Sequence, residues 1–250
     1  MRSLKPKRLH SLACPSKSSI FVVFQPSAAR LSSSSSSEEA TSSIASLTQE
    51  ELTKINLLLP RLCLSNHLPK AIHLITTTLL TNPLPKSISL SILVDSLASQ
   101  PDMTLPMSLL NRLKHSPGAH TYLTPINTML VASYFRKHKP MEALKVFNWM
   151  VRPDSPCVLD EKVCGILVCG FCRNGMVLEA LKVLRSMVAV NLVPGRVLRK
   201  WVYRGLLREA RIKEAVELNE ALVWVEDGSG DETVKKVVEL FEQMIAVWTD

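Results

Sequence analysis

Residues 161–195 read EKVCGILVCGFCRNGMVLEALKVLRSMVAVNLVPG, and this stretch decides the fold. The run GFCRNG at 170–175 separates two short amphipathic segments, and Pro194 with Gly195 ends the second segment. Each segment is too short to form a stable helix alone, so the two must stabilise each other by packing. A glycine turn between them and a proline after them therefore predict one helical hairpin.

The same pattern recurs on both sides of this hairpin. The pair Glu-Ala stands at Glu142-Ala143, Glu179-Ala180 and Glu214-Ala215, spaced by 37 and then by 35 residues. Fixed periods of this length indicate a solenoid of stacked repeats. We predict about five helix pairs within residues 52–230, and the clearest of them lie in 124–230. The units are 52–86, 87–123, 124–160, 161–195 and 196–230.

Matched apolar positions support this phase. In each first helix, two apolar residues four apart form one stripe that we expect to be buried. Four of the second helices carry a small alanine, which lets helices approach closely. The second unit is degenerate, because Pro101 and Pro106 occupy its turn and the start of its second helix. The stripe residues are Leu58 with Leu62, Leu93 with Leu97, Leu130 with Tyr134, Leu167 with Phe171, and Val202 with Leu206.

Helical periodicity continues beyond the last unit. Apolar residues at Val234, Val237, Phe241 and Ile245 share one helical face, which predicts a capping helix over 231–250. Residues 41–51 are predicted to be a linker or a helix that leads into the first unit. The fold class is therefore all-α, a right-handed α-α superhelix built from helical hairpins.

The N-terminal segment has a different composition. Residues 1–37 carry six basic residues and no acidic one, and they end in the serine run 32–37. This composition is typical of organellar transit peptides, and the apolar run 20–24 is too short for a secretory signal. We expect residues 1–40 to be a disordered transit peptide that directs the protein to the mitochondrion, with the chloroplast as the alternative destination. A disordered tail without a targeting role is the other interpretation.

Most of the net charge of +8 lies in that segment. The other 213 residues carry 24 basic and 22 acidic groups, a net charge of only +2. Removal of a transit peptide would therefore remove most of the basic bias. A nearly neutral body leaves local patches, rather than a global field, to attract a polyanion.

The composition argues against several other classes of protein. With 250 residues and 46% hydrophobic content the chain can bury a core, but its longest apolar run, about 163–172, is too short to span a membrane. Six scattered cysteines suit a reducing compartment. Cys169 and Cys172 form a CxxC pair, but the second ligand pair of a zinc site is missing, so we expect these thiols to pack. No nucleophile motif or phosphate-binding loop is visible, and we expect no enzymatic activity, no cofactor and no metal.

Four features of the central unit have the spacing of a known repeat: GFCRNG at 170–175, EAL at 179–181, Met187 and Pro194. They resemble a pentatricopeptide repeat of the plain 35-residue type, and the resemblance extends with adjustments over 124–230. It implies membership of a family of plant organellar α-solenoids that bind single-stranded RNA. The nearest alternative is the tetratricopeptide repeat, a protein-binding hairpin of about 34 residues.

The resemblance also implies which residues read RNA bases. In such repeats, side chains at the fifth and last positions of each unit each help to recognise one base. The pair Thr128 with Asp160 resembles a guanine-reading combination. A shift of one residue would substitute Asn127 for Thr128, which resembles a uracil-reading combination. Asn56 with Lys86 is the other candidate pair.

The densest basic cluster lies on the first helix of the last unit. Residues 196–213 hold seven basic groups and one acidic group. Residues four apart share a helix face, and such a face could follow the phosphates of an RNA strand. The alternative is a solvated face balanced by acidic residues of the next helix. The candidates for contact with the RNA backbone are Arg199, Lys200, Arg204 and Arg208.

These observations predict a monomeric, non-catalytic adaptor that binds single-stranded organellar RNA. Its expected role, inferred from the resemblance, is in RNA processing, stability or translation. A protein-interaction scaffold of the same architecture that binds no RNA is the alternative, and protein partners are compatible with both. A fold of this kind does not by itself decide between the two functions.

Overall fold

The computed structural model describes residues 47–81, 88–226 and 231–249. These residues form eleven α-helices and one short 3-10 turn, and no strand occurs among them, which confirms the predicted all-α class. The predicted transit peptide and the acidic loop 227–230 lie outside the described residues. The helices are α1 Gln49–Leu64, α2 Leu68–Leu79, α3 Ser91–Ser99, α4 Thr104–Lys114, α5 His120–Arg136, α6 Pro140–Met150, α7 Glu161–Arg173, α8 Val177–Ala189, α9 Arg196–Arg208, α10 Ile212–Glu226 and α11 Asp231–Thr249.

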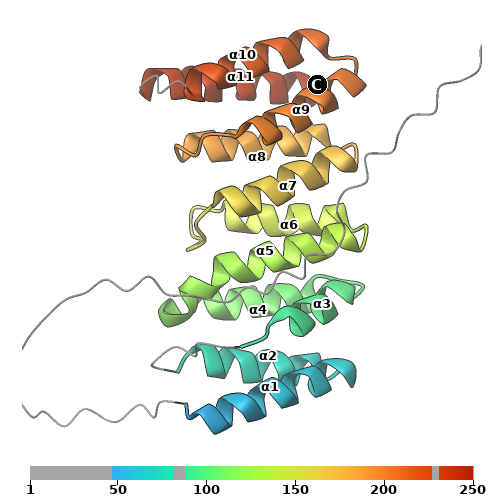
Figure 1. Cartoon of the computed structure of the whole chain (residues 1–250), viewed down its shortest axis with the longest axis vertical. Helices are drawn as coiled ribbons and strands as arrows, with labels where there is room; N and C mark the ends of the chain where they lie inside the picture. Colours follow the sequence, from blue (N-terminus) through green and yellow to red (C-terminus); the bar gives the residue numbers. More distant parts are fainter. Residues whose placement is uncertain (1–46, 82–87, 227–230, 250) are drawn as a thin grey trace, which may run out of the picture. The chain divides into compact units, whose positions relative to one another are not determined.

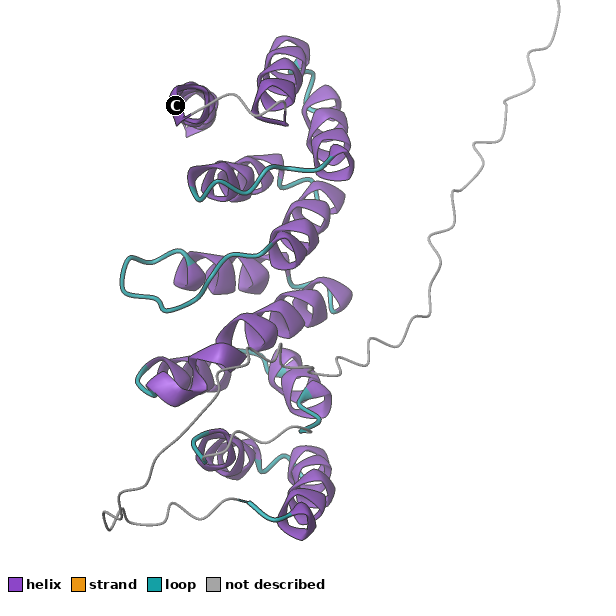
Figure 2. Ribbon diagram, turned by 60° about the vertical axis from the view of Figure 1, so that its left-hand side comes forward, coloured by secondary structure: helices purple, strands orange, loops and turns teal. Residues whose placement is uncertain are grey.

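Consecutive helices of the described unit pack neighbour to neighbour as hairpins, from α1 with α2 to α9 with α10 (Figure 1). Each first helix also packs on the first helix of the next hairpin, so α1, α3, α5, α7 and α9 form one layer. The second helices α2, α4, α6 and α8 lie in the other layer (Figure 2). This arrangement is a helical-repeat solenoid. No described helix combines the length and hydrophobicity that a bilayer crossing requires.

The turn inside the hairpins explains why the chain folds back. In four of the five units the fifteenth residue has a left-handed backbone: Asn66 at φ 57°, His138 at 56°, Gly175 at 74° and Ala210 at 58°. The residue after each of them donates its N–H to the carbonyl oxygen five residues earlier, at 2.8–3.0 Å. This hydrogen bond closes the end of the first helix in a Schellman arrangement.

The second unit turns differently, because its fifteenth residue is Pro101. The proline ring holds φ near about −65°, so a left-handed backbone is impossible there. Helix α3 is short, and a lysine from the third unit satisfies its end. Lys139 Nζ donates to the carbonyl oxygens of Ala98 at 3.1 Å and of Gln100 at 2.6 Å.

The predicted apolar stripe is buried in four of the five first helices. In the first unit the prediction was wrong, since Leu58 is 47% exposed and Leu62 is only partly buried. Helix α1 buries Ile55, Leu59 and Cys63 instead. These residues face α2 and α3, whereas no helix among the described residues packs on the side that carries Leu58.

Consecutive units approach closely at the tenth residue of the last two units. A Cβ on Gly170 of α7 would overlap the ring of Phe135 on α5. A Cβ on Gly205 of α9 would lie 3.0 Å from Cγ2 of Val177. Phe135 in turn packs edge to face on Phe171, with 5.3 Å between the ring centroids. Glycine at these two positions therefore allows close packing of the repeats.

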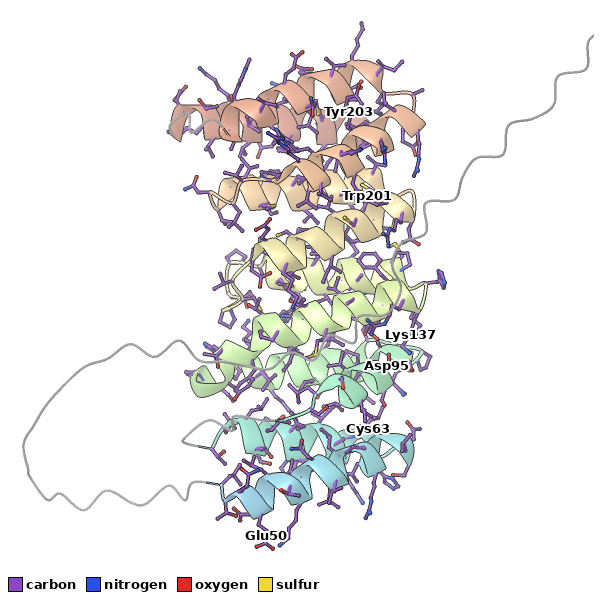
Figure 3. All side chains as sticks on the ribbon, viewed as in Figure 1. Glu50, Cys63, Asp95, Lys137, Trp201 and Tyr203 are labelled. Atoms are coloured by element: carbon purple, nitrogen blue, oxygen red, sulfur yellow. The ribbon has the colours of Figure 1, made fainter. Side chains whose placement is uncertain are left out.

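In the third unit the tenth residue is Ser133, which makes a polar contact instead. Its Oγ donates to Asp95 Oδ1 on α3 at 2.8 Å, and Lys137 Nζ donates to Asp95 Oδ2 at 3.0 Å (Figure 3). Burial opposes ionisation of Asp95, but these hydrogen bonds and the charges of Lys137 and Arg136 outweigh it. Together they hold the pKa of Asp95 below its ordinary value.

The last helix departs from the regular order. Helix α11 packs against α8 as well as α10. Arg185 on α8 donates to Glu242 Oε1 on α11 at 2.6 Å, and Phe241 is fully buried. The guanidinium of Arg211, between α9 and α10, lies 4.3 Å from the ring centroid of Trp248. At this end of the described unit, α11 therefore covers the second-helix layer.

We expect opposite effects from exchanging alanine and glycine at two equivalent turns. Gly175→Ala should lower the free energy of unfolding by about 1 kcal/mol, because an alanine Cβ disfavours a positive φ. No atom lies within 4 Å of that added Cβ, so the loss comes from the backbone alone. Ala210→Gly should raise stability by about 0.5 kcal/mol, since part of the gain is offset by greater freedom in the unfolded chain. Urea unfolding of both variants tests this, and two shifts of the same sign would contradict it.

We also expect Asp95→Asn to weaken the contact between the second and third units. The loss at neutral pH should be about 0.5–1 kcal/mol, because the carboxylate is half-exposed and its interactions are screened. A depressed pKa contributes stability above the unfolded value of about 3.9 and loses it as pH falls through the folded value. The difference in melting temperature between the wild type and the variant should therefore shrink below about pH 4. A difference that stays constant from pH 7 to pH 3 would count against this account.

Candidate nucleic-acid interface

Thr128, the predicted base-reading residue of the third unit, lies on α5 and is only 6% exposed. Its hydroxyl donates to the carbonyl oxygen of Thr124 at 2.8 Å, so its hydrogen is already used within the helix. Threonine commonly makes this bond to the residue four earlier. In the structure as described, Thr128 therefore contributes to helix packing, and reading a base would require its hydroxyl to rotate toward the ligand.

The partner predicted for Thr128 has a structural role as well. Asp160 is the N-cap of α7, and its Oδ1 accepts the backbone N–H of Val163 at 2.7 Å. A carboxylate at this place satisfies a free backbone donor and opposes the positive end of the helix dipole. Asp160 is only partly buried, and among the described residues only its Oδ1 accepts a hydrogen bond, so its second oxygen can meet a ligand. Capping and reading can thus use different oxygens of one carboxylate.

Asn127, the alternative to Thr128, is fully buried. Its Nδ2 donates to the sulfur of Cys157 at 3.1 Å, and its Oδ1 has no hydrogen-bond partner among the described residues. Asn127 stands at the fourth position of its unit, where Ile55, Leu90 and Cys164 are also buried in their units. Burial at this position favours Thr128 over the shifted register, which would place the reading side chain inside the core.

Asn56, the candidate of the first unit, connects two repeats. Its Oδ1 accepts the backbone N–H of Ser89, just before α3, at 3.2 Å. The residue predicted to act with it, Lys86, lies outside the described residues. The structure therefore shows a linking role for Asn56 and does not place the pair.

The predicted backbone contacts divide into two groups. Lys200, Arg204 and Arg208 step by four along α9 and are all exposed, so they form one cationic stripe, which we call the α9 stripe. Arg199 is only 7% exposed, so it does not belong to the α9 stripe, although it lines the groove between α9 and α10. It stands at the fourth position of its unit, which is buried in every unit and here faces α10.

A groove between α9 and α10 was not predicted from the sequence. Its volume is about 340 Å³. Its lining residues are Arg196, Arg199, Lys200 and Tyr203 on α9 and Val216, Asn219, Glu220 and Val223 on α10. The spacing of the α9 residues indicates that they share one helix face. Only the structure shows that α10 forms the opposite wall of the groove.

A second missed feature is that the basic residue at Arg208, the thirteenth position of its unit, recurs at the same position of the two preceding units. Arg136, Arg173 and Arg208 end α5, α7 and α9, and all three are exposed. Arg136 lies 3.9 Å from Asp95, and the guanidinium of Arg173 lies 5.1 Å from the ring centroid of Trp201. Continuing the repeat phase back from Arg208 would have found Arg136 and Arg173. They place one cation at the same end of three consecutive first helices.

The cysteines are arranged for packing. Burial raises the pKa of the Cys164 thiol and of the Cys172 thiol to about 12, and it raises the pKa of Cys169 as well. These thiols are protonated at neutral pH, which makes them poor nucleophiles and poor metal ligands. Among the described residues, no three His, Cys, Asp or Glu side chains come together as a metal site would require.

One comparison with known proteins bears on this interface. A family model described as PPR repeat matches residues 165–188. The match lies within α7 and α8, in the unit that resembled this repeat most, and it supports a pentatricopeptide repeat protein. Such proteins are in general helical-repeat RNA-binding proteins without enzymatic activity. The search of curated proteins found no match.

We expect Asp160→Ala to destabilise the protein by about 0.5–2 kcal/mol, because α7 loses its N-cap. Asp160→Asn should cost much less, since an asparagine oxygen can accept the same N–H of Val163. Thermal unfolding of the two variants, followed by circular dichroism, measures the difference. Equal melting temperatures for the two variants would show that the cap is not the main structural role of Asp160.

Proposed function

We propose that this protein is a non-catalytic adaptor that binds single-stranded RNA along its first-helix layer and acts in organellar RNA processing, stability or translation. The observation that carries the proposal is the α9 stripe, in a chain with a PPR repeat match. Three exposed cations on one helix face can each neutralise a phosphate and release its counterions. The arginines at the ends of α5 and α7 extend the basic surface toward the earlier repeats.

In the proposed mechanism, different residues position the RNA backbone and recognise the bases. Cations at fixed steps hold the RNA backbone without regard to sequence. Discrimination between bases then depends on few side chains, because Gly165 and Gly195 have no side chain at the reading positions of the central unit. Asp160, with one oxygen used as a helix cap, is the best reading candidate. We therefore propose broad affinity for single strands with weak sequence preference.

We further propose that the protein acts in the mitochondrion, with the chloroplast as the alternative. The support is the composition of residues 1–37, which carry six basic residues and no acidic one. Mitochondrial and chloroplast transit peptides both contain few acidic residues.

A protein-interaction scaffold is the second candidate function. It is favoured by the near-neutral body, by the internal hydrogen bonds of Thr128 and Asn127, and by exposed apolar side chains on α10. Ile212 is 61% exposed and Trp224 is 60% exposed. Tryptophan is enriched where proteins bind proteins, and an exposed isoleucine adds apolar surface.

We expect the full chain to bind a labelled single-stranded RNA with an affinity that falls as salt rises. Arg204→Gln combined with Arg208→Gln should weaken binding to all sequences alike. Each lost phosphate contact should also reduce the slope of log affinity against log salt by ~0.7. Fluorescence anisotropy at several salt concentrations measures both effects.

The matched control is Lys70→Gln combined with Arg112→Gln, which makes the same change in net charge. Both residues are exposed and lie on the second helices α2 and α4. This control should leave affinity and slope nearly unchanged. If the wild type shows no salt-dependent RNA binding while a stable protein partner copurifies with it, the scaffold function is correct and the RNA proposal is wrong.

A further inference from the structure

The groove between α9 and α10 has two walls of different character. On α9, Arg196, Lys200 and Tyr203 are four and then three residues apart, so their side chains share one face. On α10, Val216 and Val223 are seven residues apart and line the opposite wall together with polar side chains. The groove volume of about 340 Å³ is at the lower end of the roughly 300–1,000 Å³ typical of small-molecule sites.

The α9 wall is suited to an anion. Arg196 and Lys200 are exposed, and neither has an ion-pair partner among the residues that the structure describes. Residues four apart on a helix have Cβ atoms about 5–6 Å apart, so both cations can reach one phosphate group. Arg196 also lies in the first turn of α9, where the helix dipole adds positive potential.

The remainder of the groove is suited to a planar ring. Tyr203 is half-buried and lines the groove in the α9–α10 hairpin (Figure 3). Aromatic side chains stack on nucleic-acid bases without regard to sequence, because every base has a flat π surface. The two valines add apolar surface, and the exposed Asn219 and Glu220 offer donors and acceptors to the edge of a ring.

We propose that this groove binds one nucleotide, with its phosphate at Arg196 and Lys200 and its base stacked on Tyr203. Lys200 stands at the fifth position of the last unit, but neither Tyr203 nor the α10 wall belongs to the positions predicted to read bases. Stacking of a base in this groove would therefore be a contact additional to the predicted ones. The nucleotide is either free or one unit of the RNA strand, and the second case rests on the proposed function. A strand held by the α9 stripe would pass this site, because Lys200 belongs to both.

The test uses the full chain with three substitutions of aromatic residues. Tyr203→Leu removes the stacking ring and retains apolar bulk, whereas Tyr203→Phe retains the ring and removes only the hydroxyl. Trp224→Leu is the matched control, because this residue is 60% exposed on α10 but does not line the groove. Circular dichroism confirms that each variant is folded. Binding is measured by anisotropy with labelled 20-nucleotide oligouridine, and by saturation-transfer NMR with uridine monophosphate, with inorganic phosphate as competitor.

The proposal predicts that Tyr203→Leu weakens oligouridine binding by roughly 5- to 150-fold, the usual range for loss of one stacking contact. Tyr203→Phe should bind as the wild type does, and Trp224→Leu should change affinity by less than about twofold. If uridine monophosphate also binds and resists an equal concentration of phosphate, the site accepts the free nucleotide. If only the RNA binds, the nucleotide must belong to a strand.

Two results would overturn the proposal. One is equal affinity of Tyr203→Leu and Trp224→Leu for both probes. The other is displacement of uridine monophosphate by phosphate at equal concentration, which would show an anion site without base recognition. The proposed function can also fail separately. If the wild type binds uridine monophosphate in a Tyr203-dependent manner but no RNA, the groove is a nucleotide site and the RNA-binding adaptor is wrong.

Discussion

Close packing of each repeat on the one before it is the constraint on which the rest of this structure depends. It requires a small residue at the tenth position, since a Cβ on Gly170 would overlap the ring of Phe135. Ser133 occupies the same position in the third unit and uses its hydroxyl to bind Asp95 on the preceding first helix. The first unit has Arg61 there, and no described helix packs on that side of α1. The type of residue at the tenth position is therefore determined by packing between consecutive repeats, more than by packing within one hairpin.

Much of the fold could be predicted from the sequence, because apolar residues repeat with the helical period and glycine or proline marks the turns. The period indicates which residues share a face, but it does not show what covers that face. Leu58 has the correct spacing and is still 47% exposed, because it lies on the outer side of the first described helix. The packing of α11 on α8 could not be predicted for the same reason, since it depends on a contact between residues such as Arg185 and Glu242, 57 positions apart.

The candidate site was predicted less completely, because one residue type can serve two purposes at one position. Asp160 was selected as a base reader from its place in the repeat, and the structure shows it capping α7. Asn127 and Arg199 are polar in sequence, yet both stand at the fourth position and are buried. A polar residue in a repeat can therefore either contact a ligand or make an internal hydrogen bond, and the sequence does not distinguish the two. Only the exposed cations of α9 could be placed on the surface from their spacing alone.

The difference between the inner repeats and the last one explains why a polar groove occurs where it does. At the eighth position, Val94, Val131 and Val168 are fully buried or nearly so. The equivalent residue of the last unit is Tyr203, which is half-buried and faces α10 across the groove. An apolar residue is required where the repeats pack on both sides, since a buried polar group without a partner is costly. At the last first helix this requirement is relaxed. Because the eighth position of α9 does not have to pack between two repeats, the last unit can carry a polar side chain there that contacts a ligand.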